Sequence, residues 1–277
     1  MTAKPFIKYT TLPESEYTHR TLGVNNGTQI ETEQIRLVPF LMERDTPLMW
    51  EVSKPELFTW MPSGELHTYE AFHKTWAGFS TLSDWYSWVI YVSAPAEGGE
   101  KKWVLCGHVC LLDISLIHRR SEVGCIWLHP SVQGTFVMLE TNYALLRFAF
   151  EKLQAGRVQW KTHFRNIASQ KAAVKLGFTL EGLFRKHMAH TDGKWRHSYF
   201  YSMTDDEWFG REEETEDARR GLDVIAAAAE LLNGPEVASQ GRQKQLEELI
   251  AEKKKTGKQL PSSIEGKPLV GEMAKEE

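Results

Sequence analysis

The chain has 277 residues, 42% of them hydrophobic and 10 of them Trp, which is enough to bury the core of one large domain with appendages. Its net charge of -4 gives no electrostatic footprint for a nucleic acid partner. Its apolar runs are far shorter than the roughly 20 residues that cross a bilayer, and its N-terminus lacks the apolar core of a signal peptide. These features predict a soluble, cytoplasmic protein without a membrane partner.

The N-terminal third is expected to hold a polar arm, one strand and two helices. Residues 1–33 are polar and predict a lead-in arm, whereas residues 34–40 alternate with period two and predict the first strand. A helix is expected to start at Asp45, because proline is tolerated in a first helical turn, and to end before Pro55. Thr68 is a candidate cap for the second helix.

Strands dominate the middle of the chain. Residues 85–92, 103–114 and 119–128 predict three strands in succession, and an apolar stripe predicts a helix over residues 138–153. Residues 157–162 predict a further strand. The segments 179–190 and 194–203 predict a hairpin, because Asp192-Gly193 between two strand patterns is a strong turn signal. Cys106, Cys110 and Cys125 lie within these strand-like runs and are expected to be reduced and structural.

Composition changes after Trp208. The acidic run 212–217 precedes an Ala-rich, helix-prone segment at 224–232 and a charged helix at 243–255. Residues from Gly257 onward have the composition of a disordered tail. The predicted organisation is an arm at 1–33, a domain at 34–210, a helical extension at 211–256 and a tail at 257–277.

Two segments have the layout of a cofactor site. Gln133-Gly134-Thr135 stands one short turn before a helix, whose N-terminus offers unpaired N–H groups to a phosphate, although one Gly there is also typical of an ordinary turn. Asn166 and Gly177 are equally expected as helix caps on structural grounds. The ordered set is more specific: Arg157-Val158, Asn166-x-x-Ser169, Leu176-Gly177-Phe178 and Glu181-Gly182-x-x-Arg185.

This set resembles the second half of the GNAT-superfamily acetyltransferase core, in the branch that includes the ribosomal-protein N-terminal acetyltransferases. The resemblance covers about residues 34–208. It implies an α+β fold with a mixed, mostly antiparallel sheet and helices on both faces, to which the C-terminal helical extension is added. It also implies acetyl-CoA as co-substrate, direct transfer to an amine, and no metal.

The resemblance further implies which residues hold the cofactor. Backbone groups near Trp127 and Leu128 would hold the acetyl carbonyl, the loop after them would cradle the pyrophosphate, and the Asn166 turn would contact the pantetheine and thiol end. The implied set is Trp127, Leu128, Gln133, Gly134, Thr135, Val137, Asn166 and Ser169. The loop departs from the family pattern, because Phe136 and Met138 replace a Gly and a small residue.

Three residues are candidates for catalysis. Amine attack on a thioester needs a neutral amine, so a base helps, and Glu122 is the first candidate. The alternative is that Glu122 is a sheet-edge carboxylate paired with Arg119 or Arg120. His108 is the second candidate base, although a lone strand His is often structural, and Ser169 is a candidate proton donor to the thiolate or a helix-starting residue.

Three functional hypotheses stay open. The first is an N-acetyltransferase acting on a small-molecule amine or a protein N-terminus; the aromatic-rich segments around Trp60 and Trp85 favour a small molecule slightly, and core packing is their alternative. The second is a non-catalytic acyl-CoA-binding or partner-binding domain, motivated by Phe136 and Met138. The third is a structural subunit that docks through its C-terminal helices. A homodimer is compatible with each.

Overall fold

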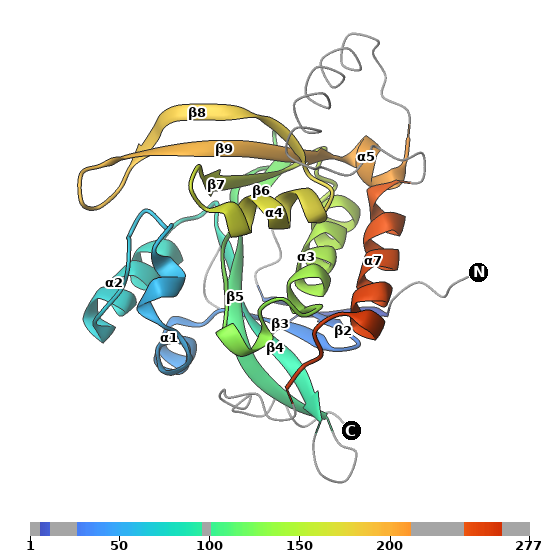
Figure 1. Cartoon of the computed structure of the whole chain (residues 1–277), viewed down its shortest axis with the longest axis horizontal. Helices are drawn as coiled ribbons and strands as arrows, with labels where there is room; N and C mark the ends of the chain where they lie inside the picture. Colours follow the sequence, from blue (N-terminus) through green and yellow to red (C-terminus); the bar gives the residue numbers. More distant parts are fainter. Residues whose placement is uncertain (1–5, 12–26, 96–100, 212–240, 262–277) are drawn as a thin grey trace.

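The computed structural model describes residues 6–11, 27–95, 101–211 and 241–261. Nine strands form one sheet, which Figure 1 shows running through the molecule. They are β1 (Ile7–Thr11), β2 (Thr28–Thr32), β3 (Ile35–Pro39), β4 (Tyr86–Pro95), β5 (Lys101–Ser115), β6 (Arg120–Leu128), β7 (Arg157–His163), β8 (Thr179–Ala189) and β9 (Trp195–Thr204). Their spatial order is β1-β2-β3-β4-β5-β6-β7-β9-β8.

The sheet is antiparallel except at its centre. β6 and β7 pair in parallel from Arg120↔Arg157 to Val123↔Trp160, whereas every other neighbouring pair among the described strands is antiparallel. Pairing stops at Val123 although β6 continues to Leu128, so the two strands part over the second half of β6. The predicted mixed, mostly antiparallel sheet is confirmed, and the parting strands open a gap in it.

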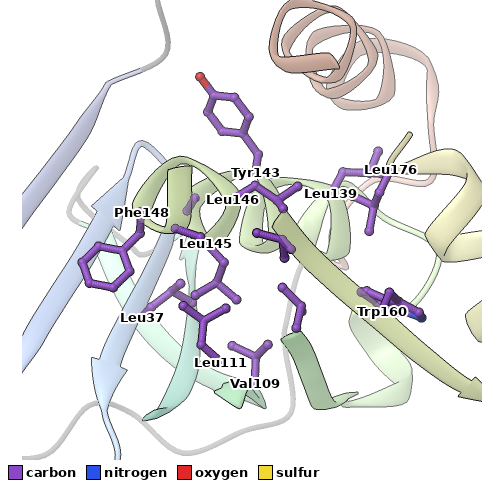
Figure 2. Close-up of a cluster of buried hydrophobic side chains, with 14 of the residues drawn as sticks. Leu37, Val109, Leu111, Leu139, Tyr143, Leu145, Leu146, Phe148, Trp160 and Leu176 are labelled. Atoms are coloured by element: carbon purple, nitrogen blue, oxygen red, sulfur yellow. The ribbon is translucent and has the colours of Figure 1, made fainter. Parts of the chain in front are cut away.

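Strand alternation sends side chains to two cores, one on each face of the sheet. On β3, Val38 joins the core beneath α1 (Met42–Val52) and α2 (Tyr69–Ser80), while its neighbour Leu37 joins the core beneath α3 (Val137–Arg147). Figure 2 shows this second core, with Leu37 and Leu111 from the sheet lying beneath Leu145 of α3. Helices on both faces, as predicted, therefore fix the parting strands between two packed layers.

The helix after the loop is shorter and less regular than its apolar stripe predicts. α3 ends at Arg147 and continues as a single π-type turn, η4 (Phe148–Lys152). α4 (Ile167–Lys175) is capped as expected, because the Asn166 side chain accepts a hydrogen bond from the Ser169 N–H at 3.1 Å. Gly177 follows α4 with a φ of +92°, which only glycine adopts without strain.

Two N-terminal predictions are corrected. The predicted arm contains β1 and β2, which extend the sheet through pairs such as Ile30↔Leu37. The first helix begins at Met42, three residues before the predicted start, because the Asp45 carboxylate lies inside the first turn and accepts from the Leu41 N–H at 2.7 Å. The Thr68 cap on α2 is confirmed by its 3.2 Å bond from the Ala71 N–H.

The C-terminal helix packs back on the domain. α5 (Asp205–Phe209) follows β9, and α7 (Arg242–Thr256) lies beside α3 (Figure 1). Tyr143 donates to Glu247 at 2.6 Å, and Lys254 forms a 2.6 Å ion pair with the buried Glu140. The predicted acidic run 212–217, the Ala-rich segment 224–232 and the tail beyond residue 261 lie outside the described residues. No helix in the described ranges is long and apolar enough to cross a membrane.

Candidate active site

A cavity of about 830 Å³ opens where β6 and β7 part. Residues of β6 and β7 form one wall, including Glu122, Cys125 and Lys161. Residues from the segment before α2 and from the β8–β9 hairpin form the other walls. The hairpin is tied to that segment by Thr191, whose N–H and hydroxyl donate to the carbonyls of Pro62 and Ser63 at 3.0 and 2.9 Å. The cavity is therefore bounded by elements that are distant in sequence.

Glu122 lies in the cavity wall and is 5% exposed. Its Oε2 is 2.6 Å from Lys161 Nζ, and the same ammonium is 2.5 Å from Asp113 Oδ2. The Glu122 carboxylate on β6 is thus paired with Lys161 on the neighbouring parallel strand β7. It is not paired with Arg119 or Arg120, as the alternative interpretation held. Asp113 and Lys161 were missed in the sequence, although each is a charged residue inside an otherwise apolar strand pattern.

Burial changes the chemistry of the carboxyl group. Desolvation raises the pKa of Glu122 from 4.5 to about 7, and the nearby Lys161 ammonium opposes only part of that effect. For Lys161 itself, burial opposes the charge, but Glu122 and Asp113 together raise its pKa. A carboxyl group with a pKa near neutrality is partly ionised at pH 7, which is the condition a general base needs to take and return a proton.

The backbone beyond Glu122 is irregular, and that irregularity shapes the cavity wall. Cys125 has a φ of +47° at the point where the β5–β6 register shifts. Close approach of β5 also requires glycine: a Cβ added at Gly107 would lie 2.3 Å from the Trp127 carbonyl oxygen, and one added at Gly124 would lie 2.6 Å from Leu112 Cδ2. Residues 124–126 of this bulged segment line the cavity.

Several predicted residues lie behind or beyond this wall. The Trp127 indole is 3% exposed and packs in the α1–α2 core, and Leu128 is buried in the α3 core. His108 is 2% exposed, with its ring stacked on Trp76 at 5.0 Å and Nδ1 3.2 Å from the Cys125 carbonyl. His108 is not among the described residues that line the cavity. The structure therefore separates this candidate base from the site and packs it against the bulge.

Asn166 and Ser169 do line the cavity, at the start of α4. Asn166 uses its Oδ1 as the helix cap, which leaves its amide group at the cavity edge. Ser169 Oγ accepts a hydrogen bond from the Trp160 indole at 3.0 Å. Because the indole can only donate, this contact leaves the Ser169 proton available for a different acceptor.

The phosphate-binding candidates lie in the loop before α3. Gln133 and Gly134 are exposed, and Gly134 has a φ of +77°. Thr135 and Val137 are buried, with the Thr135 hydroxyl donating to the Val132 carbonyl at 2.6 Å. The bulk at residue 136 does not cover the loop, because the Phe136 ring is 5% exposed and belongs to the α3 core. The Phe136 side chain, which replaces the family Gly, therefore does not itself cover the loop.

The C-terminal segment reaches the same loop. Lys258 Nζ donates to the Gln133 carbonyl at 3.0 Å, and the Gln133 side chain donates to the Leu128 carbonyl at 2.9 Å. Lys254 lies over the Phe136 ring, with Nζ 5.1 Å from its centroid. Lys258, which was assigned to the tail, thus contacts the predicted phosphate loop.

Aromatic and basic groups also line the cavity. Trp60 and Trp85 line it, whereas Phe58 and Trp76 are fully buried, so the aromatic cluster divides between cavity and core. His163 lines the cavity 4.9 Å from Trp60; burial, with Arg196 adding to it, lowers the pKa of His163 to about 4. This His is neutral at pH 7, and its Nδ1 accepts from the Arg165 N–H at 3.1 Å.

Arg196 of β9 is the second basic group that sequence reasoning missed. It lines the cavity, and burial lowers the pKa of its guanidinium while Glu122 partly opposes that effect. The signal available in the sequence was the alternation of side chains between the two faces of the hairpin strand that follows the predicted turn. Within the described ranges no group of three or more His, Cys, Asp or Glu side chains could hold a metal ion, and the three cysteines are free.

Comparisons with known proteins agree with this geometry. The sequence profile of the family described as Acetyltransferase (GNAT) domain matches residues 34–179, more than half of the chain. YdaF of Bacillus subtilis strain 168, provisionally named a ribosomal N-acetyltransferase, is 27% identical over 106 residues. That match covers 38% of this chain and 57% of YdaF, so the chain spans little more than half the length of this curated relative.

Solved structures are similar over a larger share. A provisionally named acetyltransferase from T. thermophilus is 27% identical, with a TM-score of 0.56 over 72% of this chain and 96% of that one. A Salmonella typhimurium acetyl transferase, described as modifying the N-terminal serine of 50S ribosomal subunit protein L7/L12, has a TM-score of 0.50 over 62% of this chain and 95% of that one. At 20% identity the second likeness shows the fold alone. The chain belongs to the GNAT acetyltransferase family.

Proposed function

We propose that the protein is an acetyl-CoA-dependent N-acetyltransferase that moves an acetyl group directly to a primary amine. The observation that carries the proposal is the cavity at the parting of β6 and β7, with a buried carboxylate of raised pKa in its wall and Ser169 at its edge. A neutral amine, a polarised carbonyl and a protonated leaving group are the three needs of this reaction, and each has a candidate group at this site.

Glu122 acts as the base in this proposal. It removes a proton from the ammonium form of the acceptor, which is mostly charged at neutral pH because such amines have a pKa of about 8–10. Lys161, held between Glu122 and Asp113, keeps the carboxylate oriented. Acetyl-CoA, when bound, supplies a thioester whose C–S bond breaks as the new C–N bond forms.

The other steps use backbone and α4. N–H groups of residues 125–128 in the bulged part of β6 are the candidate donors to the acetyl oxygen, where negative charge develops. Ser169 gives its hydroxyl proton to the leaving thiolate, and the second proton, which the attacking nitrogen loses as the amide forms, replaces it by way of solvent. The first proton, which Glu122 took from the ammonium, returns to solvent, so one proton is released overall. The Asn166 amide would bind the pantetheine arm in the gap between the strands.

The loop from Gln133 to Val137 would bind the pyrophosphate. Gly134 is exposed with a φ of +77°, and the loop leads into the N-terminus of α3, a position that favours an anion. Burial of the Phe136 ring supports binding over the decayed-site hypothesis, because this bulky side chain packs in the α3 core and not on the exposed surface of the loop.

The transfer assay tests the proposal. Purified chain, acetyl-CoA and a panel of small amines and N-terminal peptides would be followed by CoA thiol release, alongside thermal unfolding with and without acetyl-CoA. We expect transfer to at least one amine, and stabilisation of about 2.7 kcal/mol at 100-fold excess over the dissociation constant. Stabilisation without transfer to any amine would favour the non-catalytic acyl-CoA-binding domain. Absence of both would refute the proposal.

A further inference from the structure

Arg196 is a cation in the cavity whose hydrogen-bonding capacity is largely unused. Its side chain lines the cavity from β9, the strand that pairs with β7 and so lies next to the strand of Lys161. The Nε atom is fully buried and has no hydrogen-bond partner among the described residues. The guanidinium does contact the Met188 sulfur, with Nη1 at 3.4 Å, and thioether sulfur is a weak acceptor.

Lys161 and Arg157 on the neighbouring strand both pair with carboxylates, whereas Arg196 pairs with none that the structure describes. Lys161 contacts two carboxylates at 2.5 and 2.6 Å. Arg157, at the other end of β7, forms a bidentate pair with Glu181. No described carboxylate oxygen lies within ion-pair distance of Arg196, although the charge of Glu122 is close enough to act on it.

A guanidinium in this position favours a specific kind of ligand. It stays charged at every physiological pH and presents N–H donors in a planar fork, which matches the two oxygens of a carboxylate. Buried donors without a partner are unfavourable, so an anionic acceptor group that reaches Arg196 gains a charge-assisted hydrogen bond and relieves that cost. The cavity therefore presents complementary groups to two charges, with Glu122 suited to an amine and Arg196 to an anion.

We propose that the acceptor is a small amino acid-like molecule whose carboxylate binds Arg196 while its amine faces Glu122. This inference rests on the proposed function and names the substrate class of the same site. A compact acceptor is favoured because the cavity is bounded on this side by the hairpin, which Thr191 ties to the segment at Pro62 and Ser63. Trp60 and Trp85 supply apolar surface for its side chain.

Matched acceptors measure the contribution of the carboxylate. The pairs are tryptophan with tryptamine, phenylalanine with phenethylamine and alanine with ethylamine, together with a peptide amide that presents a free N-terminus. For wild type we expect kcat/KM to be about 10- to 100-fold higher for at least one carboxylate-bearing member than for its partner, as a charge-assisted hydrogen bond predicts.

The variants assign that preference to one side chain. Because the carboxylate also changes the pKa of the amine, the decisive quantity is the change in the ratio between wild type and Arg196→Gln. We expect Arg196→Gln to reduce the ratio to within about threefold of unity and Arg196→Lys to retain part of it, since the charge remains but the fork is lost. Arg185→Gln is the matched control, because Arg185 is an exposed arginine of the same hairpin that does not line the cavity.

Each outcome has a defined meaning. Unchanged acetyl-CoA binding and unfolding temperature would show that the Arg196 variants are folded. Three results would overturn the inference and leave the proposed function standing. The first is a carboxylate preference that survives in both variants, and the second is a preference for the peptide amide. The third is no turnover of any carboxylate-bearing acceptor while acetyl-CoA binds. Failure of wild type to bind acetyl-CoA would overturn the proposed function and this inference with it.

Discussion

Glu122→Gln should lower activity and raise stability, and the two effects come from the same burial. The substitution keeps the size of the side chain but removes the base, so we expect kcat to fall by about 10²- to 10⁴-fold while acetyl-CoA affinity is retained. For wild type, kcat/KM should rise with pH through about 7, because the raised pKa of Glu122 sets the pH at which the base becomes ionised. Stopped assays of CoA release between pH 5.5 and 9 would measure both.

The stability effect has a sign that depends on pH. Burial raises the pKa of Glu122 from 4.5 to about 7, so the folded protein holds this proton more tightly than the unfolded chain. The resulting stability is fully present below pH 4.5 and is lost as pH rises through 7. At about 1.4 kcal/mol per pKa unit, ionising Glu122 in the folded state costs about 3 kcal/mol by pH 8.

Glu122→Gln avoids that cost because it stays neutral. Chemical denaturation at pH 5 should give unfolding free energies for the two proteins within about 1 kcal/mol of each other, and at pH 8 the variant should be more stable by about 3 kcal/mol. Glu181→Gln is the comparison: the pKa of Glu181 is lowered by its hydrogen bonds from Arg157 and Ser202 against the effect of burial, so this variant should lose stability at pH 8. A Glu122→Gln variant with unchanged relative stability from pH 5 to 8 would refute the reasoning.

Three further substitutions test other parts of the account. Ser169→Ala should lower kcat by about 100-fold in the CoA-release assay, with little change in acetyl-CoA affinity measured by titration, because the alanine cannot protonate the thiolate. Gly107→Ala should lower the unfolding free energy by about 1–3 kcal/mol in denaturant melts, since its Cβ would lie 2.3 Å from the Trp127 carbonyl oxygen. Gly78→Ala in α2 is its control and should instead stabilise by up to about 1 kcal/mol, because a Cβ there meets nothing within 4 Å. Glu140→Gln should cost about 1–3 kcal/mol in the same melts, because it weakens the 2.6 Å contacts from Thr32 and Lys254; equal stability of Glu140→Gln and wild type would show that α7 docks without this ion pair.

The fold was predictable where local pattern and burial agree. Alternation on residues 34–40 predicted β3 because one face of that strand packs under α1 and the other under α3. β1 and β2 were missed because most of their residues are polar, so that alternation is weak and pairing within the sheet decides the structure. The π-type turn at 148–152 was missed for a different reason: its apolar residues continue the stripe of α3, so the sequence pattern does not distinguish it from a longer α-helix.

The site was predictable in part. Glu122, Asn166 and Ser169 were singled out in the sequence, and all three line one cavity. Lys161 and Arg196 were missed because their role depends on β7 and β9 meeting beside β6, which no local pattern reveals. His108 was named as a candidate base because the sequence does not say to which face of β5 its side chain belongs. In the structure the side chain packs in the aromatic core beneath α2.

The most direct test of the central claim is hydrogen–deuterium exchange of wild type with and without acetyl-CoA. The account predicts protection in three separate segments that the fold brings together: the bulged end of β6 at 124–128, the loop and first turn of α3 at 133–138, and the start of α4 at 166–170. Added acetyl-CoA that protects none of these segments, or protects a different region alone, would contradict the assignment of the parted strands as the acetyl-CoA site.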